Sequence, residues 1–210
     1  MSEHHASQKP SEAEARSSNV RVGPVAVLVP VKAFGQAKVR LAPALTPDAR
    51  AALARAMAEH VLAACAPLPT AVVCDDADVA TWARARGARV VWEPGRGLNR
   101  AVQAGVTRLR AAGARRVIVA HGDLPLAGAV AWVARFAGVT LVPDRFDDGT
   151  NVVCVPTGAG FGFTYGPGSF RRHGAEARRL GLGLRVVREP LLGYDVDWPT
   201  DLLPAEATSR

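Results

Sequence analysis

The chain has 210 residues, of which 49% are hydrophobic and 21% charged, and its formal net charge is +7. This length suits one compact domain with a core of its own. The basic residues are dispersed in pairs such as Arg115-Arg116 and Arg171-Arg172, with no lysine-rich tail and no interleaved aromatic residues. A dispersed positive charge of this kind favours small anions over nucleic acid as ligands.

The two ends of the chain differ in character from its middle. Residues 1–23 are polar and are expected to form a disordered arm, residues 24–203 to form one folded domain, and residues 204–210 a tail. The N-terminal residues lack the apolar core of a signal peptide, and no window approaches the ~18 apolar residues of a membrane span. The sequence therefore predicts a cytoplasmic protein without a membrane partner.

The cysteines are isolated from one another and lie in apolar surroundings. Cys65, Cys74 and Cys154 are odd in number and form no CxxC pair. We expect them to be reduced core residues, because zinc sites need clustered ligands and disulfides need pairs.

Apolar runs alternate with segments of helical periodicity along the folded region. The first run, at 25–31, is nearly continuous, which is typical of a strand buried on both faces of a parallel sheet. Thr46-Pro47-Asp48 provides a cap, a first-turn proline and an acidic residue for the helix that follows. Further strands are predicted at 70–74, 89–92, 117–120, 139–142, 152–155 and 184–187, and helices at 46–65, 77–86, 99–112, 127–136 and 168–180.

This alternation predicts an α/β domain with a mainly parallel sheet and helices on both faces. In such a sheet, ligands bind where the carboxyl ends of the strands meet the loops. The loops to examine are therefore 30–41, 93–99, 121–125, 143–151, 163–169 and 194–198.

Three cations follow the first strand directly. Lys32, Lys38 and Arg40 lie in one short loop, close enough in sequence to converge on a phosphate chain and neutralise it. A solvated basic loop is the alternative. The chain has neither the GxxxxGK[ST] sequence of a P-loop nor the GxGxxG sequence of a dinucleotide-binding fold.

Carboxylates follow two other segments. Asp123 lies just after the strand predicted at 117–120. Asp195 and Asp197 lie on the same side of an extended segment. Such oxygens are the ligands that Mg²⁺ prefers, with Mn²⁺ as a second possible ion. A capping role for Asp123 and a polar surface strand at Asp195-Val196-Asp197 are the alternatives. Together with the cationic loop, the acids favour metal-assisted phosphoryl or nucleotidyl transfer.

At this point the sequence resembles a known family, the 2-phospho-L-lactate and phosphoenolpyruvate guanylyltransferases of coenzyme F-420 biosynthesis. The resemblance covers residues 25–202. Its blocks are VPVK with AKVRL, then GLN, GDLP, PDR with DGTN, YGPGSF and DVD, in that order along the chain. The PDR, DGTN and YGPGSF blocks are the specific ones, whereas GLN or DLP alone would mean little.

The resemblance implies a single-domain Rossmann-like nucleotidyltransferase fold of the sugar-nucleotide-transferase type, with GTP and magnesium as ligands. By motif match it places Asp123, Asp195 and Asp197 at the metal, and Thr150, Gly166 and Ser169 at the phosphorylated acid. Gly97 and Asn99 would lie near the nucleotide. The turn at 166–169 also suits a phosphate physically, since its amides and hydroxyl precede a helix N-terminus; Ser169 could equally cap that helix.

The implied reaction needs no general base. A phosphate oxygen of the acid is already anionic and attacks the α-phosphorus of GTP, while the metal, Lys32, Lys38 and Arg40 screen the charge. Two alternatives are open for Arg145, the substrate carboxylate or an ion pair with Asp144 or Asp148. His121 is expected to act indirectly at most, and His173 to have a surface or packing role.

The expected product is enolpyruvoyl-2-diphospho-5'-guanosine with pyrophosphate, if phosphoenolpyruvate is the acceptor. The sequence leaves 2-phospho-L-lactate and 3-phosphoglycerate open as acceptors, because pocket contacts that fine are not visible in it. A downstream transferase is the expected partner, since the product is a labile diester. A non-catalytic nucleotide- or RNA-binding protein is the alternative of a different class, and the oligomeric state is not predicted.

Overall fold

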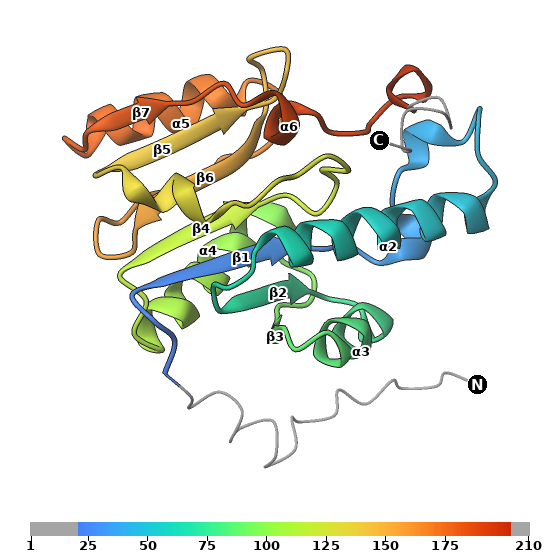
Figure 1. Ribbon diagram of the computed structural model, residues 1–210, viewed down its shortest axis with the longest axis horizontal. Helices are drawn as coiled ribbons and strands as arrows, with labels where there is room; N and C mark the ends of the chain where they lie inside the picture. The colour runs from blue at the N-terminus through green and yellow to red at the C-terminus, as the bar shows by residue number, and fades with distance from the viewer. Residues whose placement is uncertain (1–20, 203–210) are drawn as a thin grey trace, which may run out of the picture.

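The computed structural model describes residues 21–202, so most of the expected N-terminal arm and the whole 204–210 tail lie outside the described residues. Val22, within the arm predicted at 1–23, is buried, and its N–H donates to the carbonyl of Ala112. One sheet of seven strands, in the order β3-β2-β1-β4-β6-β5-β7, forms the centre of the described chain (Figure 1). Its strands are β1 (Val25–Pro30), β2 (Thr70–Cys74), β3 (Arg89–Trp92), β4 (Arg116–Ala120), β5 (Val139–Pro143), β6 (Thr150–Pro156) and β7 (Leu184–Val186).

Helices cover both faces of the sheet, as predicted. On one face, α2 (Pro47–Ala64), α3 (Ala77–Ala85) and the 3-10 helix η3 (Ala131–Arg135) pack on one core cluster. On the other face, α4 (Gly97–Ala111) and α5 (Ser169–Arg179) pack on a second cluster. Alternate residues of β1 contribute to the two clusters, because successive side chains of a strand point to opposite faces. This arrangement confirms the predicted α/β class.

The sheet is mainly parallel, and β6 is the exception among the described strands. It pairs antiparallel with both β4 and β5. Residues 144–149 alone connect β5 to β6. A parallel crossover needs a dozen residues or more, whereas antiparallel neighbours can be joined by a short hairpin. The short connection therefore fixes the direction of β6.

Several local elements differ from the prediction. The helix predicted at 127–136 is only the 3-10 helix η3, and Gly128 precedes it at a position where glycine weakens an α-helix. The helix predicted from residue 99 begins at Gly97. The described chain also contains elements that were not predicted, namely α6 (Pro190–Gly193) and the 3-10 helices η1 (Phe34–Gln36), η2 (Val39–Leu41) and η4 (Pro199–Asp201).

The cysteines are core residues, as expected. Cys65, Cys74 and Cys154 are all buried and free. Burial raises the pKa of the Cys65 thiol to about 12 and that of Cys74 to about 11, so both stay protonated near neutral pH. Among residues 21–202, no helix is long and apolar enough to cross a membrane.

Candidate active site

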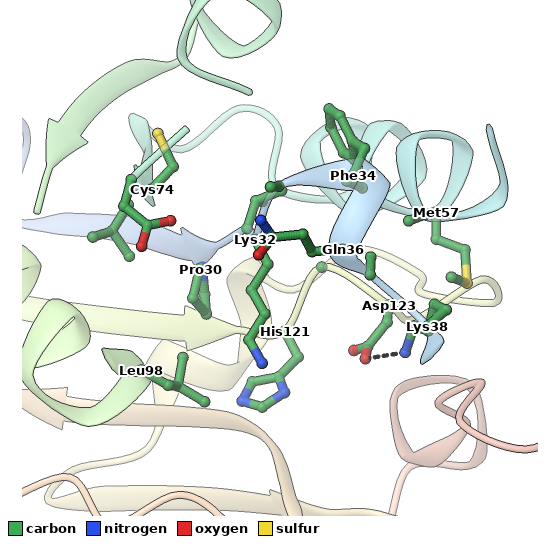
Figure 2. A pocket seen from close by; sticks show the side chains of 18 of the residues that line it. Pro30, Lys32, Phe34, Gln36, Lys38, Met57, Cys74, Leu98, His121 and Asp123 are labelled. Atoms are coloured by element: carbon green, nitrogen blue, oxygen red, sulfur yellow. Dashed lines mark hydrogen bonds and ion pairs between the residues drawn. The ribbon is translucent and has the colours of Figure 1, made fainter. Parts of the chain in front are cut away.

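A cavity of about 660 Å³ opens at the carboxyl ends of β1, β2 and β4 (Figure 2). The strand order makes this possible, because β1 pairs in parallel with both β2 and β4 and their ends therefore share one edge. The predicted residues that line the cavity are Lys32, Lys38, Arg40, Gly97, Asp123 and Asp197. The site lies where ligands bind in open α/β sheets.

The loop after β1 is held at both ends by buried apolar side chains. The Phe34 ring packs edge-on against Trp82 with 5.2 Å between centroids, and Leu41 is fully buried. Between them, Lys38 adopts a left-handed backbone conformation with φ 55°. This turn directs its side chain inward, where only 9% of it is exposed.

The Lys38 ammonium group contacts two of the three predicted metal ligands. Its Nζ lies 2.5 Å from Oδ2 of Asp123 and 3.0 Å from Oδ1 of Asp197. Burial by itself would lower the pKa of Lys38, but the attraction of Asp123 and Asp197 outweighs it and raises that pKa. Lys38 is therefore charged throughout the physiological range.

Arg40 and Lys32 are the more exposed cations of this loop. Arg40 Nη1 donates to Oδ2 of Asp197 at 3.1 Å, and its guanidinium lies over the Trp198 ring. Lys32 is exposed and extends along the cavity toward His121 (Figure 2). The three predicted cations thus line one cavity, and Lys38 and Arg40 share the carboxylate of Asp197.

Asp123 has one carboxylate oxygen engaged and one unpartnered. Oδ2 accepts from Lys38, whereas Oδ1 is buried and has no hydrogen-bond partner among the described residues. Burial would raise the pKa of this carboxyl, but Lys38 and, to a lesser extent, His121 lower it below its usual range. Asp123 is therefore an anion, and a buried anionic oxygen without a donor is costly unless a ligand supplies a positive charge.

Asp195 and Asp197 belong to the segment that follows α6, and of the two only Asp197 lines the cavity. The amide of Val196 between them donates to the carbonyl of Asp123 at 3.4 Å, which places the segment beside the end of β4. Asp195 is partly buried and receives a long hydrogen bond of 3.4 Å from Asn151. Burial and the nearby charge of Asp123 raise the pKa of Asp195.

The three acids therefore lie in one region, but their side chains are not arranged as a ready metal cage. Within residues 21–202, no group of three or more His, Cys, Asp or Glu side chains is positioned to hold a metal ion. The Lys38 ammonium group contacts both Asp123 and Asp197 and occupies the space between these carboxylates. The donors still suit Mg²⁺, since they are hard carboxylate oxygens and Oδ1 of Asp123 is unpartnered.

Asp201 and Arg145 hold this acidic segment in place, and sequence reasoning did not identify Asp201. The buried Oδ2 of Asp201 accepts the N–H groups of Asp197 at 2.8 Å and Trp198 at 2.7 Å. Arg145 pairs with Asp201 and donates to the carbonyl of Asp195 at 2.8 Å. The predicted ion pair of Arg145 with Asp144 or Asp148 is therefore wrong, and a contact with the substrate carboxylate stays a prediction. Asp144 accepts the N–H groups of Phe146, Asp148 and Gly149 instead.

Thr150 and Ser169, predicted to bind the phosphorylated acid, meet from different elements. Thr150 begins β6 and Ser169 begins α5, and their hydroxyl oxygens are 3.5 Å apart in a buried position. Gly166 has φ 115°, which a side chain would disfavour, and its carbonyl accepts the N–H of Ser169. Asp148 accepts the N–H of Gly168 at 3.0 Å and ties the two loops together.

Gly97 and Asn99 have different positions at the start of α4. Gly97 lines the cavity with φ 67°. The Asn99 side chain forms two hydrogen bonds with the backbone of Tyr165, accepting its N–H at 2.6 Å and donating to its carbonyl at 3.4 Å. Asn99 thereby joins the wall of the cavity to the loop that carries Gly166, and its predicted contact with the nucleotide stays a prediction.

Two histidines lie close to predicted site residues, and His173 is a packed residue rather than a surface one. His173 is fully buried, and its Nδ1 lies 3.0 Å from the hydroxyl of Thr150. The His121 ring lies against that of Tyr165, with 4.8 Å between centroids and an angle of 49° between the rings, and its Nε2 has no hydrogen-bond partner among the described residues. The signal for His173 is its spacing, because Ser169 and His173 are four residues apart and share one face of α5.

The sheet order and a charged cavity at its edge define a nucleotidyltransferase fold. In agreement, a nucleotidyl transferase from Methanothermobacter thermautotroptrophicus superposes with a TM-score of 0.60 at 15% identity, over 85% of this chain and 94% of that chain. At this identity the likeness concerns the fold alone.

The family follows from the sequence comparisons. Residues 25–205 match the family described as guanylyl transferase CofC like, and the chain belongs to this family. Phosphoenolpyruvate guanylyltransferase of Sphaerobacter thermophilus is 38% identical over 184 residues, covering 83% of this chain and 89% of that protein. The protein of the same name from Chloroflexus aggregans is 34% identical, covering 82% and 92%. The chain is thus an enzyme of the nucleotidyltransferase class.

Proposed function

We propose that this protein joins the GMP part of GTP to phosphoenolpyruvate and releases pyrophosphate. The observation that carries the proposal is the convergence of Lys38, Asp123 and Asp197 at one end of a cavity of about 660 Å³. That volume lies within the range of small-molecule sites, roughly 300–1,000 Å³. Cations for a triphosphate and carboxylates for a divalent ion are the two groups that nucleotidyl transfer requires.

Asp123, Asp195 and Asp197 are the residues that would hold Mg²⁺, with Mn²⁺ as a second possible ion. The unpartnered Oδ1 of Asp123 supports this assignment, because a buried anionic oxygen is a suitable ligand. When bound, the ion would supply positive charge to the phosphates. Lys38, displaced from its carboxylates, would then be free to contact a phosphate oxygen.

The proposed reaction requires no general base, because its nucleophile is already an anion. A phosphate oxygen of the acid forms a bond to the α-phosphorus of GTP. The bond from that phosphorus to the bridging oxygen breaks, and pyrophosphate leaves with the electron pair. The cavity where these anions would meet is lined by Lys32, Lys38 and Arg40. The positive charges of these side chains would lower the repulsion between the acid and GTP.

The acid would bind beside the cavity, at Thr150, Gly166 and Ser169. Their assignment rests on the family motifs, and the geometry supports it, because two hydroxyl groups and the start of α5 meet there. The relatives named phosphoenolpyruvate guanylyltransferase favour phosphoenolpyruvate as the acceptor. 2-Phospho-L-lactate and 3-phosphoglycerate are the acceptors to compare with it.

The product, enolpyruvoyl-2-diphospho-5'-guanosine, belongs to coenzyme F-420 biosynthesis. It is a labile diester, so a downstream transferase that consumes it promptly would be the functional partner. The proposed site of this reaction is the cytoplasm.

The test is pyrophosphate release from GTP and Mg²⁺ with each phosphorylated acid in turn. We expect release with phosphoenolpyruvate, at a higher kcat/KM than with 2-phospho-L-lactate or 3-phosphoglycerate. ATP and CTP are the nucleotide controls. No release from GTP with any phosphorylated acid would refute the proposal. Salt-sensitive affinity for RNA, with no such activity, would instead support a nucleic-acid-binding protein.

A further inference from the structure

His173 is a polar side chain in an aromatic environment, and both of its ring nitrogens are hydrogen bonded. It is fully buried on α5 and is surrounded by the rings of Phe161, Phe163 and Tyr165, with centroids 4.9–6.3 Å away. Nε2 lies 2.9 Å from the backbone nitrogen of Thr164, and Nδ1 lies 3.0 Å from Oγ1 of Thr150. Buried polar groups are normally hydrogen-bonded, so these two partners satisfy the ring, and their identity fixes the direction of each hydrogen bond.

The partner of Nε2 fixes the tautomer of the ring. A backbone N–H can only donate, so Nε2 must accept from Thr164 and therefore carries no proton. The single proton of the neutral ring is then on Nδ1. It follows that Nδ1–H donates to the hydroxyl oxygen of Thr150.

This direction decides what the Thr150 hydroxyl can do. Because its oxygen accepts from His173, its own hydrogen must point to another acceptor. The only other partner within the described chain is the Ser169 hydroxyl at 3.5 Å, which is longer than an ordinary O–H···O bond of roughly 2.5–3.0 Å. If Thr150 does not donate to Ser169, the hydroxyl hydrogen of Thr150 is available to a ligand. If Thr150 does donate to Ser169, the hydroxyl hydrogen of Ser169 is available instead.

We infer that His173 is a positioning residue, which orients the hydroxyl hydrogens of Thr150 and Ser169 toward the anionic group of the bound phosphorylated acid. The inference rests on the proposed function, since Thr150 and Ser169 bind the acid in it. Hydrogen bonds run in one direction, from the Thr164 amide through His173 to Thr150, so that the hydroxyl pair presents a donor to the ligand. A donor stabilises an anion, whereas a hydroxyl turned the other way would repel it.

Two substitutions separate this role from packing. In His173→Asn the amide nitrogen takes the place of Nδ1 and can donate to Thr150, while the acceptor for Thr164 is lost. In His173→Gln the terminal amide oxygen reaches the place of Nε2 and can accept from Thr164, while the donor to Thr150 is lost. Each of the two variants therefore keeps one of the two hydrogen bonds of His173 and loses the other. Thermal melting of both variants shows whether they fold.

The measurement is calorimetric binding of phosphoenolpyruvate and, separately, of GTP, followed by steady-state KM values. We expect His173→Gln to weaken phosphoenolpyruvate binding on the order of tenfold, the size of one hydrogen bond to a charged group, and to leave GTP binding unchanged. His173→Asn should stay within about threefold of the native protein. In a Thr150→Val background, His173→Gln should have no further effect.

Other outcomes overturn the inference. An equal loss of phosphoenolpyruvate affinity in His173→Asn and His173→Gln would mean that the ring only packs. An equal loss of affinity for GTP and for phosphoenolpyruvate in one variant would mean the same. NMR of histidine labelled in the ring, in the native protein at pH 7, should show the proton of His173 on Nδ1, and a proton on Nε2 would also refute it. If the native protein binds phosphoenolpyruvate but does not turn it over with GTP, the proposed reaction fails while this inference stands.

Discussion

The Nζ atom of Lys38 lies 2.5 Å from Oδ2 of Asp123, although 85 residues separate the two in sequence. Lys38 comes from the loop after β1 and Asp123 from the loop after β4, and these strands are parallel neighbours. A cation assigned to the phosphates thus pairs with a carboxylate assigned to the metal. Each keeps the other charged, since the pKa of Lys38 is raised and that of Asp123 is lowered.

Asp123→Asn removes the charge of this carboxylate with little change of shape. We expect turnover to fall on the order of 10²-fold or more, because the variant loses the proposed ligand to the divalent ion where phosphate charge must be neutralised. Pyrophosphate release at saturating GTP and phosphoenolpyruvate measures this loss. Circular dichroism is the control for folding, and a well-folded variant with native turnover would contradict the metal assignment.

Lys38→Met removes the ammonium group but retains the length of the side chain. Without it, Asp123 and Asp197 lose their shared counter-charge, so the free energy of unfolding should fall by about 1–2 kcal/mol, less than for a fully buried charge because both carboxylates are partly exposed. Mg²⁺ should then raise the melting temperature of the variant more than that of the native protein, because the ion no longer competes with an ammonium group.

Melting curves with and without MgCl₂ decide this second prediction. Arg55→Met is a control, because the guanidinium of Arg55, on α2, lies over the Phe34 ring. It forms no ion pair with Asp123 or Asp197. An equal shift by Mg²⁺ in the native protein and both variants would show that the ion does not bind where Lys38 lies.

His173 makes the stability of the protein depend on pH. Burial is the main cause that lowers the pKa of this histidine from 6.5 to about 4. Between these values the unfolded chain binds a proton that the folded protein excludes, so the free energy of unfolding falls as the pH falls from 6.5 to 4 and is unaffected by this group below that range. The total effect is about 3 kcal/mol.

Urea denaturation at several pH values from 7 to 4 measures this slope. His173→Gln should reduce it, because glutamine does not titrate. Part of the slope should remain in the variant, since burial also lowers the pKa of His121. An unchanged slope in the variant would show that His173 titrates normally in the folded protein.

Gly138 and Gly87 offer a matched pair for the fold. Both have φ 75°, but an added Cβ at Gly138 would overlap the carbonyl oxygen of Gly183, whereas at Gly87 no atom lies within 4 Å. Gly87→Ala should cost about 1 kcal/mol for the left-handed backbone alone. Gly138→Ala should cost about 2 kcal/mol more, because the overlap would disturb the bond from Val139 N–H to Gly183 at the β5–β7 edge.

Urea unfolding of the two glycine variants gives the comparison directly. Activity of Gly87→Ala should be native, since Gly87 follows α3 outside the cavity. Equal destabilisation in both variants would mean that the backbone conformation, rather than the contact with Gly183, sets the cost at Gly138.

The class of the fold and the chemical character of the site could be predicted from the amino-acid sequence. Continuous apolar runs such as Val25–Pro30 can be satisfied only in strands covered on both faces, and the helices between them then have to lie on those faces. Lys32, Lys38 and Asp123 could be placed at the site because charged residues that directly follow buried strands must emerge at the sheet edge. Motif resemblance supplied Thr150, Gly166 and Ser169, which composition and spacing alone do not single out.

Which of these residues contact one another could be learned only from the three-dimensional fold. The order of strands brings Lys38 to Asp123, and the hairpin that reverses β6 brings Thr150 to Ser169 and His173. Such contacts join residues far apart in the chain, and they depend on strand order, strand direction and the rotation of each helix. Local periodicity reports none of these, because it records only which face of an element is apolar and not what that face meets.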